Sequence, residues 1–197
     1  MNKINQMENA REQKEQQIIN GVNVTKLSGA VEAIKSNSVV SQFNFRAKGK
    51  WISGGHNQTT INDFYGVCQT HSRSHPFVLD KDEPPILLGE NRGPNPAEDT
   101  LAALNGCLTT TLIYHAAAQN VKIDEVESTL AGDIDIQGLL GMSEKVRNGY
   151  EKIKVIFKVK SNAPKEKIRE LVELAQKRSP VFDIISHPTP VEVSLKE

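Results

Sequence analysis

Two cysteines, Cys68 and Cys107, are the residues of this 197-residue chain best suited to covalent chemistry. A cysteine attacks as its thiolate, which a nearby cation or hydrogen-bond donors must stabilise. Cys107 lies within a run of small residues, whereas His71 and His75 follow Cys68. The first setting suits a nucleophile or the simple packing of a small apolar side chain. The second resembles part of a zinc site.

The Cys68-x2-His71-x3-His75 cluster is an incomplete zinc pattern. In an extended segment Cys68 and His71 point to opposite faces, and the sequence shows no second ligand pair at zinc-site spacing. We therefore predict no metal and no other cofactor, although stoichiometric zinc in the purified protein would revive the metal hypothesis.

The segment around Cys107 predicts a long helix that begins at Pro96. Asn95 can cap it, Pro96 suits the first helical position, and Glu98 can complete a capping box. Larger side chains then recur at three- and four-residue steps, with nothing to break the pattern before Asn120. They are Leu101, Leu104, Leu108, Thr111, Leu112 and His115. We expect a long and buried helix.

Small residues form the middle of this helix. Ala102, Gly106 and Thr110 lie four apart, and Ala103, Cys107 and Thr111 run beside them. Glycine inside a helix costs about 1 kcal/mol relative to alanine. Gly106 therefore favours the close approach of another backbone near Cys107. At that contact Cys107 is either a reactive thiol or a small apolar residue that only packs.

The first half of the chain predicts a helical extension followed by strands. We expect a solvated helix or loose tail over residues 1–20. A short helix from Thr25 to Ser36 should dock its apolar face on the domain or on a partner subunit; that face comprises Leu27, Ala30, Val31 and Ile34. Alternation from Phe43 to Trp51 predicts a half-buried strand. A turn at Gly54-Gly55-His56-Asn57 leads to a second strand, about Gln58 to Gln69, which includes Cys68.

Prolines interrupt the segment after this second strand. Pro76, Pro84 and Pro85 make residues 77–79 and 86–88 edge pieces or connections. After Asn120 we expect a strand pair over about 126–136 and 153–159, a loop over 138–149, and a helix from Pro164 to Ser179. A last strand is expected over 191–195. This order predicts an antiparallel α+β fold, with an N-terminal extension over 1–40 and one domain over 41–197.

Composition excludes several classes of protein. Lys+Arg and Asp+Glu both number 24, so no overall field favours nucleic acid or an anionic membrane. There is no apolar run of membrane-spanning length, and the N-terminus has no signal-peptide core. We expect a cytoplasmic protein with both cysteines as thiols.

Three motifs give the chain a family likeness. They are Asn95-Pro96-Ala97-Glu98 followed by Leu101-Ala102-Ala103-Leu104-Asn105-Gly106-Cys107, Asp82-Glu83-Pro84-Pro85 upstream, and Ser179-Pro180-Val181 downstream. Over about residues 43–197 the sequence resembles the OsmC-like superfamily, which includes the organic hydroperoxide resistance proteins. The resemblance implies an antiparallel sheet with a long central helix and a second helix. It also implies an intertwined homodimer with active sites at the subunit interface.

The same resemblance implies a reaction. Peroxidases of this family use the cysteine at the Cys107 position to reduce a hydroperoxide to an alcohol, leaving a sulfenic acid that a second cysteine converts to a disulfide. Here that second position is Ser179, so an external thiol or dithiol must act as reductant. Cys68 could substitute if its Cα lay within about 7 Å of that of Cys107. The alternative is a non-catalytic dimer that binds an apolar small molecule at the subunit interface.

Activation of Cys107 needs a cation, because the helix dipole fades within the first turn and Cys107 lies about three turns in. The candidates are Arg46, His56, Arg92 and His115. Family peroxidases carry an arginine near the turn that here reads Gly54-Gly55-His56-Asn57, so the resemblance makes His56 the first candidate and Arg46 the second.

Glu98 corresponds to an acidic residue that family members place before the cysteine. Nine residues put it on the opposite side of the helix from Cys107 and about 13 Å along the axis. Glu98 therefore serves the partner subunit, orients a cation, or only completes the capping box.

Overall fold

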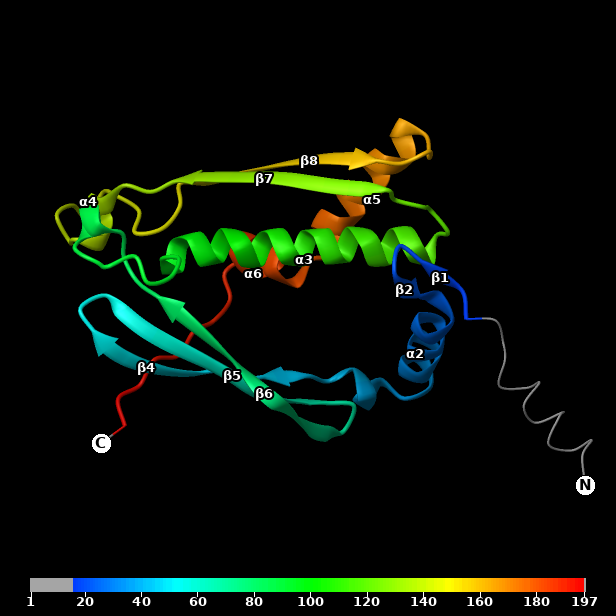
Figure 1. Cartoon of the computed structure of the whole chain (residues 1–197), viewed down its shortest axis with the longest axis horizontal. Coiled ribbons are helices and arrows are strands. Elements are labelled where there is room, and N and C mark those ends of the chain that lie inside the picture. The colour runs from blue at the N-terminus through cyan, green and yellow to red at the C-terminus, as the bar shows by residue number, and fades with distance from the viewer. Residues whose placement is uncertain (1–15, 197) are drawn as a thin grey trace, which may run out of the picture. The chain divides into compact units, whose positions relative to one another are not determined.

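The computed structural model describes residues 16–196 (Figure 1). The fold is α+β with antiparallel strands, a long helix α3 (Pro96–Ala118) and a second helix α5 (Lys165–Arg178), as predicted. Residues divide into two compact units. The first contains residues up to 32, 108–127 and 158 onward, and the second contains 33–107 and 128–157. The boundary expected near residue 40 stays a prediction.

The first unit has a closed apolar core. Its buried residues are Leu112 and Ala116 from the second half of α3, Leu171 and Ala175 from the inner face of α5, and Ile123 from the segment that follows α3. Ile168 and Val172 pack beside them, so the predicted inner face of α5 is confirmed. The helix ends at Arg178, and a short helix α6 (Pro180–Ser186), which the sequence analysis did not predict, comes directly after it.

A small hairpin adjoins this core. Strands β1 (Ile18–Ile19) and β2 (Val22–Asn23) pair across Asn20 and Gly21, whose φ angles of 52° and 76° are left-handed. The Asn20 amide donates to the Val121 carbonyl (2.9 Å) and accepts from the Ile123 N–H (2.9 Å). Residues 16–20 of the predicted tail therefore belong to a hairpin, and residues 1–15 lie outside the described residues. The Asn-Gly pair was the signal for this turn.

The predicted helix near residue 25 is confirmed as α2 (Val24–Ser36). Its apolar face is not buried within the described chain, because Ala30, Val31 and Ile34 are exposed. A short 3-10 helix, η1 (Ser38–Ser41), then leads to the sheet.

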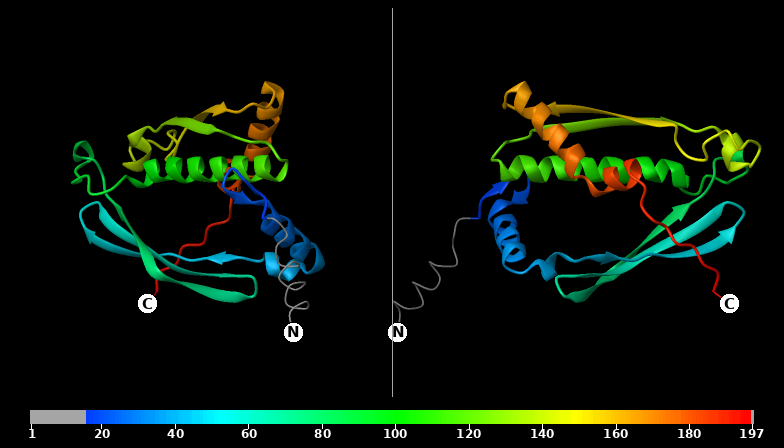
Figure 2. Two further views of the ribbon diagram at one scale, coloured as in Figure 1. Left: turned by 45° about the vertical axis from the view of Figure 1, so that its right-hand side comes forward. Right: turned by 180° about the vertical axis from the view of Figure 1, so that it is seen from behind.

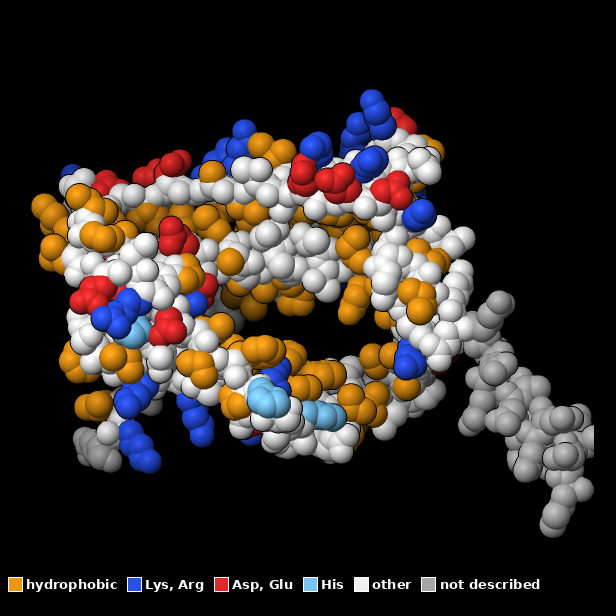
Figure 3. Space-filling view, viewed as in Figure 1, with side chains coloured by type: hydrophobic (Ala, Val, Ile, Leu, Met, Phe, Trp, Pro, Cys, Tyr) orange, Lys and Arg blue, Asp and Glu red, His pale blue; other side chains and the backbone are white. Residues whose placement is uncertain are grey.

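The second unit contains a four-stranded antiparallel sheet of β3 (Asn44–Phe45), β4 (Lys48–Ser53), β5 (His56–Gly66) and β6 (Gln69–Lys81). Figure 2 shows β5 and β6 as a long hairpin. The strand expected to be half-buried is exposed: every residue of β4 is exposed, and Phe45 is 74% exposed. Hydrophobic atoms of the sheet are visible at its surface in Figure 3.

Two boundaries in this sheet differ from those predicted. Cys68 is not in a strand but in the β5–β6 turn, where Val67 and Cys68 have left-handed φ angles of 50° and 60°. Residues 77–79 are part of β6, which continues through Pro76. The β5–β6 register shifts between Ile61 and Asp63, opposite the β6 segment that holds Pro76. That irregularity accommodates a residue without an N–H.

Strands β7 (Glu125–Asp133) and β8 (Lys152–Lys160) form a two-stranded sheet that runs along α3 (Figure 2). The pair was predicted, but β7 ends at Asp133, and Ile136 begins a short helix, α4 (Ile136–Leu139). The expected last strand over 191–195 is absent: residues 187–196 form no strand, and Val191, Val193 and Leu195 are exposed. Alternating sequence makes a strand only when a neighbour supplies hydrogen bonds. No described helix is both long and apolar enough to cross a membrane.

Candidate functional site

Helix α3 begins with the predicted capping box. The Glu98 N–H donates to Asn95 Oδ1 (2.8 Å), and the Asn95 N–H donates to Glu98 Oε2 (2.9 Å). The Tyr150 hydroxyl donates to the Ala97 carbonyl (2.9 Å). Burial, and then the nearby charge of Glu98, raise the pKa of Tyr150. Glu98 therefore has a defined part in fixing the helix start.

The first half of α3 has two unlike sides. Leu104 is buried, whereas Ala102, Ala103 and Gly106 are exposed; we call these three residues the small-residue side. A Cβ at Gly106 would meet nothing within 4 Å. The backbone expected to approach Gly106 is therefore not supplied by the described chain itself, and α3 is buried on one side only.

Cys107 lies where these two sides meet. It is half-buried, follows Ala103 by one helical turn and precedes the buried Leu108. Both cysteines of the chain are thiols, with Cys68 exposed in its turn. The Cys107 sulfur thus lies at the edge of the open side of α3.

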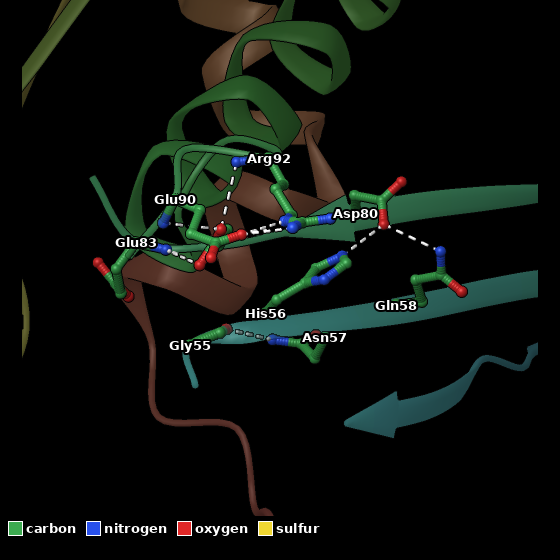
Figure 4. Close-up of polar contacts among 9 residues, drawn as sticks. Gly55, His56, Asn57, Gln58, Asp80, Glu83, Glu90 and Arg92 are labelled. Atoms are coloured by element: carbon green, nitrogen blue, oxygen red, sulfur yellow. Dashed lines mark hydrogen bonds and ion pairs between the residues drawn. The ribbon is translucent and has the colours of Figure 1, made fainter. Parts of the chain in front are cut away.

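His56 begins β5 and forms a buried polar pair (Figure 4). It is 8% exposed, and its Nε2 lies 2.8 Å from Asp80 Oδ1, which also accepts a hydrogen bond from the Gln58 amide (3.0 Å). The hydrogen bonds from His56 and then Gln58 lower the pKa of Asp80. His56 Nδ1 is buried and has no hydrogen-bond partner among residues 16–196.

Asp82 organises the loop between the sheet and α3. It is 2% exposed and accepts backbone N–H bonds from Glu83 (2.8 Å), Glu90 (3.1 Å) and Arg92 (3.2 Å). Burial alone would raise the pKa of Asp82, but these donors leave it lowered. A Cβ at Gly89 would lie 1.8 Å from the Glu83 carbonyl oxygen, so the tight loop requires glycine. The Asp82-Glu83-Pro84-Pro85 motif therefore has a structural role.

Lys81 occupies the other face of the sheet. Asn57 pairs with Lys81 and Gln58 with Asp80, and successive residues alternate faces. Lys81 is 9% exposed, and its Nζ lies 2.7 Å from Asp99 Oδ2 on α3. The pair borders an open cavity of about 390 Å³, lined also by Asn57, Thr59, Pro96, Thr100 and Ala103.

Lys81 was not among the site residues predicted from the sequence. The signal was its place in the alternation Phe77, Leu79, Lys81, which puts a lysine on the same strand face as two apolar residues.

Aromatic side chains gather at the other end of this sheet. The rings of Phe43, Phe45 and Phe64 lie 5.8–6.4 Å apart, and His71 stacks on Phe64 at 4.9 Å. The Arg73 guanidinium carbon lies 5.4 Å from the Phe64 ring centroid and 5.3 Å from that of Phe77. We call Phe43, Phe45, Phe64, His71 and Phe77, with Arg73, the aromatic face.

Three of the four predicted activating groups have a carboxylate partner. Arg46 Nε lies 3.1 Å from Asp63 Oδ1, His56 binds Asp80, and Arg92 Nε donates to Glu90 Oε2 (2.6 Å). Arg46 and His56 belong to the sheet unit, as do Glu98 and Cys107. His115 lies on the part of α3 that belongs to the first unit.

Ser179 has a helix-end role. It is 2% exposed, and its Oγ accepts the Phe182 N–H (3.2 Å) as the cap of α6. The zinc-like cluster is dispersed among other contacts: His71 Nε2 lies 3.1 Å from the Gly66 carbonyl oxygen, and His75 Nδ1 lies 3.1 Å from Ser74 Oγ. Within residues 16–196, no three His, Cys, Asp or Glu side chains are placed to hold a metal ion.

The comparisons agree with this architecture. The model of a family described as OsmC-like protein matches residues 89–194. An OsmC-like protein from Mycoplasma pneumoniae has a similar structure, with a TM-score of 0.55, 16% identity, and coverage of 74% of this chain and 89% of that one. An OsmC-like protein from Vibrio cholerae has a TM-score of 0.53 and 14% identity, covering 74% of this chain and 94% of that one. No curated protein sequence matches the chain. The family match covers more than half of the chain, so the resemblance predicted from its motifs is confirmed.

Proposed function

Because this chain belongs to the OsmC-like family, we propose that it reduces organic hydroperoxides through the thiol of Cys107. The observation that carries this proposal is the place of Cys107 on α3. It is half-buried, beside the packed Leu108 and at the edge of the open small-residue side. A sulfur at such an edge can be shielded from water and still receive a substrate.

The proposed reaction balances without a cofactor. The Cys107 thiolate attacks one oxygen of the hydroperoxide, so a sulfur–oxygen bond forms, the oxygen–oxygen bond breaks, and the alkoxide leaves and takes up a proton as the alcohol. Cys107 becomes a sulfenic acid, oxidised by two electrons. An external thiol then displaces water to form a mixed disulfide, and a second thiol releases Cys107.

The buried Ser179 hydroxyl supports the need for an external reductant. It caps α6, and an oxygen cannot form a disulfide. The cycle requires a compartment in which thiols are kept reduced, so we propose that it runs in the cytoplasm.

Two surfaces support a homodimer as the active form. The small-residue side of α3 is open at Gly106, and the aromatic face exposes Phe43, Phe45 and Phe77. Contiguous exposed apolar surface on a chain is typical of an interaction site. In a symmetric dimer each copy presents the same two surfaces to the other. One two-fold contact between the copies can therefore cover both the small-residue side and the aromatic face.

The groups that activate Cys107 are part of the proposal. Glu98 and either His56 or Arg46 are assigned this role, from the same chain or from the second copy. Each of these groups already has a partner in its own chain. Glu98 accepts the Asn95 N–H, His56 contacts the Asp80 carboxylate, and Arg46 contacts the Asp63 carboxylate. To act on the sulfur, His56 and Arg46 must share or exchange these partners.

A stoichiometric reaction tests the proposed function. Reduced protein is mixed with one equivalent of cumene hydroperoxide and a reagent that traps sulfenic acid, and intact protein and peptides are weighed by mass spectrometry. We expect the trapped adduct on Cys107 and one equivalent of cumyl alcohol. The Cys68→Ser variant should behave like the wild type, since Cys68 is exposed in a turn. An unmodified Cys107 beside unconsumed hydroperoxide would refute the proposal.

The exposed aromatic face supports a second candidate function, the non-catalytic binding of an apolar small molecule at the subunit interface. Under that alternative, Cys107 is a packing residue. A Cys107→Ser protein that retained ligand binding and all cellular function would favour it over the peroxidase.

A further inference from the structure

A cavity of about 560 Å³ lies within the first unit, bordered by the start of β7, the end of β8 and the first half of α5. We call it the α5 cavity. Its floor is apolar, because Val159, Ala163 and Ile168 line it and are half-buried. Val159 and Ile168 also pack against the closed core, so the floor is formed before any ligand arrives. A volume of this size is in the range of small-molecule sites.

Charged side chains surround this floor. Lys158 Nζ lies 2.6 Å from Glu127 Oε2, so the charges of these two residues offset each other. The remaining charged residues of the lining form no ion pair within residues 16–196. They are Glu125, Lys160, Lys165 and Arg169. Three unpaired cations and one carboxylate leave the α5 cavity with two positive charges.

This charge selects a class of ligand. The whole chain has a net charge of +0, so the excess of positive charge at the α5 cavity is local. A phosphate monoester carries nearly two negative charges at about pH 7, which matches the cavity, whereas a carboxylate carries only one. The Arg169 guanidinium can donate two parallel hydrogen bonds to phosphate oxygens, and the ammonium groups of Lys160 and Lys165 add two compact charges.

We propose that the α5 cavity binds an organic phosphate monoester. The apolar body of the ligand lies on Val159 and Ile168, and its phosphate contacts Lys165 and Arg169 at the rim. This site is separate from the proposed peroxidase, because its lining residues belong to the first unit and Cys107 belongs to the second. Binding there requires no reaction at the thiol.

Calorimetric titration of the full chain with 1-naphthyl phosphate at about pH 7.5 tests the proposal. We expect one ligand per chain. Inorganic phosphate has the charge without the apolar body, and 1-naphthoate has the same two rings with one charge, so each should bind about tenfold more weakly. No binding of 1-naphthyl phosphate would overturn the proposal. Equal binding of inorganic phosphate would replace the organic ligand by the free ion, and equal binding of 1-naphthoate would remove the need for a dianion.

A matched pair of arginine variants tests where the ligand binds. Arg169→Gln removes a cation of the rim and should weaken the binding of 1-naphthyl phosphate about tenfold. Arg178→Gln changes an equally exposed arginine of α5 that does not line the cavity, and it should bind like the wild type. Equal affinities of Arg169→Gln and Arg178→Gln would place the ligand elsewhere and overturn the proposal.

Two further variants keep this test decisive. If Arg169→Gln loses the helical circular dichroism of the wild type, Lys165→Gln removes another exposed cation of the rim and has the same expected result. Ala163→Phe fills the floor without changing the charge, so it should weaken 1-naphthyl phosphate about tenfold and inorganic phosphate much less. A folded Ala163→Phe protein with wild-type affinity for 1-naphthyl phosphate would show that the apolar floor is not used.

Discussion

The core beneath α5 is aliphatic and the aromatic face of the sheet is rich in phenylalanine, yet only the core is covered by its own chain. Leu112, Leu171 and Ala175 are fully enclosed by their own chain, whereas Phe45 and Phe77 are 74% and 58% exposed. Both sets alternate or recur with the period of their element. Periodicity therefore tells which side of an element is apolar, but not whether the same chain covers it. The homodimer proposed above would explain this difference, since a second copy could cover the sheet unit, which also carries Cys107.

The largest effect should come from the closed core. Leu171→Ala removes buried methyl groups and leaves a cavity, so the free energy of unfolding should fall by about 2–5 kcal/mol. Glu173→Ala, on the exposed side of α5, should change it by less than about 0.5 kcal/mol. Chemical denaturation measures both variants. If Leu171→Ala and Glu173→Ala lowered the free energy of unfolding equally, Leu171 would not lie in an enclosed core.

Gly106→Leu should leave the closed core of the single chain intact and affect only the open side of α3. The side chain has open space within one chain and improves helix propensity by nearly 1 kcal/mol, so the chain itself should fold. It should nevertheless block the approach of a second α3, which would turn dimers into single chains of 21.8 kDa. Light scattering measures the mass. A Gly106→Leu dimer of wild-type strength would place the interface elsewhere.

A smaller effect is expected at the start of α3. Asn95→Ala removes one half of the capping box and should lower the free energy of unfolding by about 1 kcal/mol. Glu98→Gln keeps a side-chain acceptor and should have a lesser effect on stability. If peroxide reduction falls with Glu98→Gln and not with Asn95→Ala, Glu98 acts in the reaction as well as in the cap.

The smallest effect is one of pH. The pKa of Asp82 is lowered from its ordinary 3.8, so its charged form stabilises the fold above that value, and this contribution disappears as the pH falls through the lowered pKa. Asp82→Asn should lose stability at about pH 7 and differ little from the wild type at about pH 2. Denaturation at both pH values, with Asp183→Asn in exposed α6 as control, measures this. An unchanged pH dependence would mean that the Asp82 carboxylate does not hold the loop.

Local signals predicted local structure well. Asn95, Pro96 and Glu98 fixed the start of α3, and the period of Ile168, Leu171 and Ala175 identified the inner face of α5, because capping and helical periodicity depend on residues close in sequence. Burial of β4 and strand formation over 191–195 could not be predicted, since both depend on surfaces that a neighbouring element must supply.

The candidate site divides in the same way. Cys107 and its family motif were readable from sequence, because both lie in one continuous helix. The contact partners of the charged groups could not be predicted from the sequence. His56 with Asp80, Lys81 with Asp99, and Arg73 with Phe64 and Phe77 all join residues whose proximity depends on strand register. The left-handed turn at Cys68 likewise results from the β5–β6 hairpin and not from its own residue type.

Turnover of an organic hydroperoxide with an excess of an external dithiol tests the central claim most directly. The wild type should consume cumene hydroperoxide continuously, in proportion to enzyme and dithiol, and Cys107→Ser should consume it no faster than the dithiol in buffer. If the wild type is as slow as the dithiol alone, or if Cys107→Ser matches the wild type, Cys107 is not the nucleophile of a peroxidase.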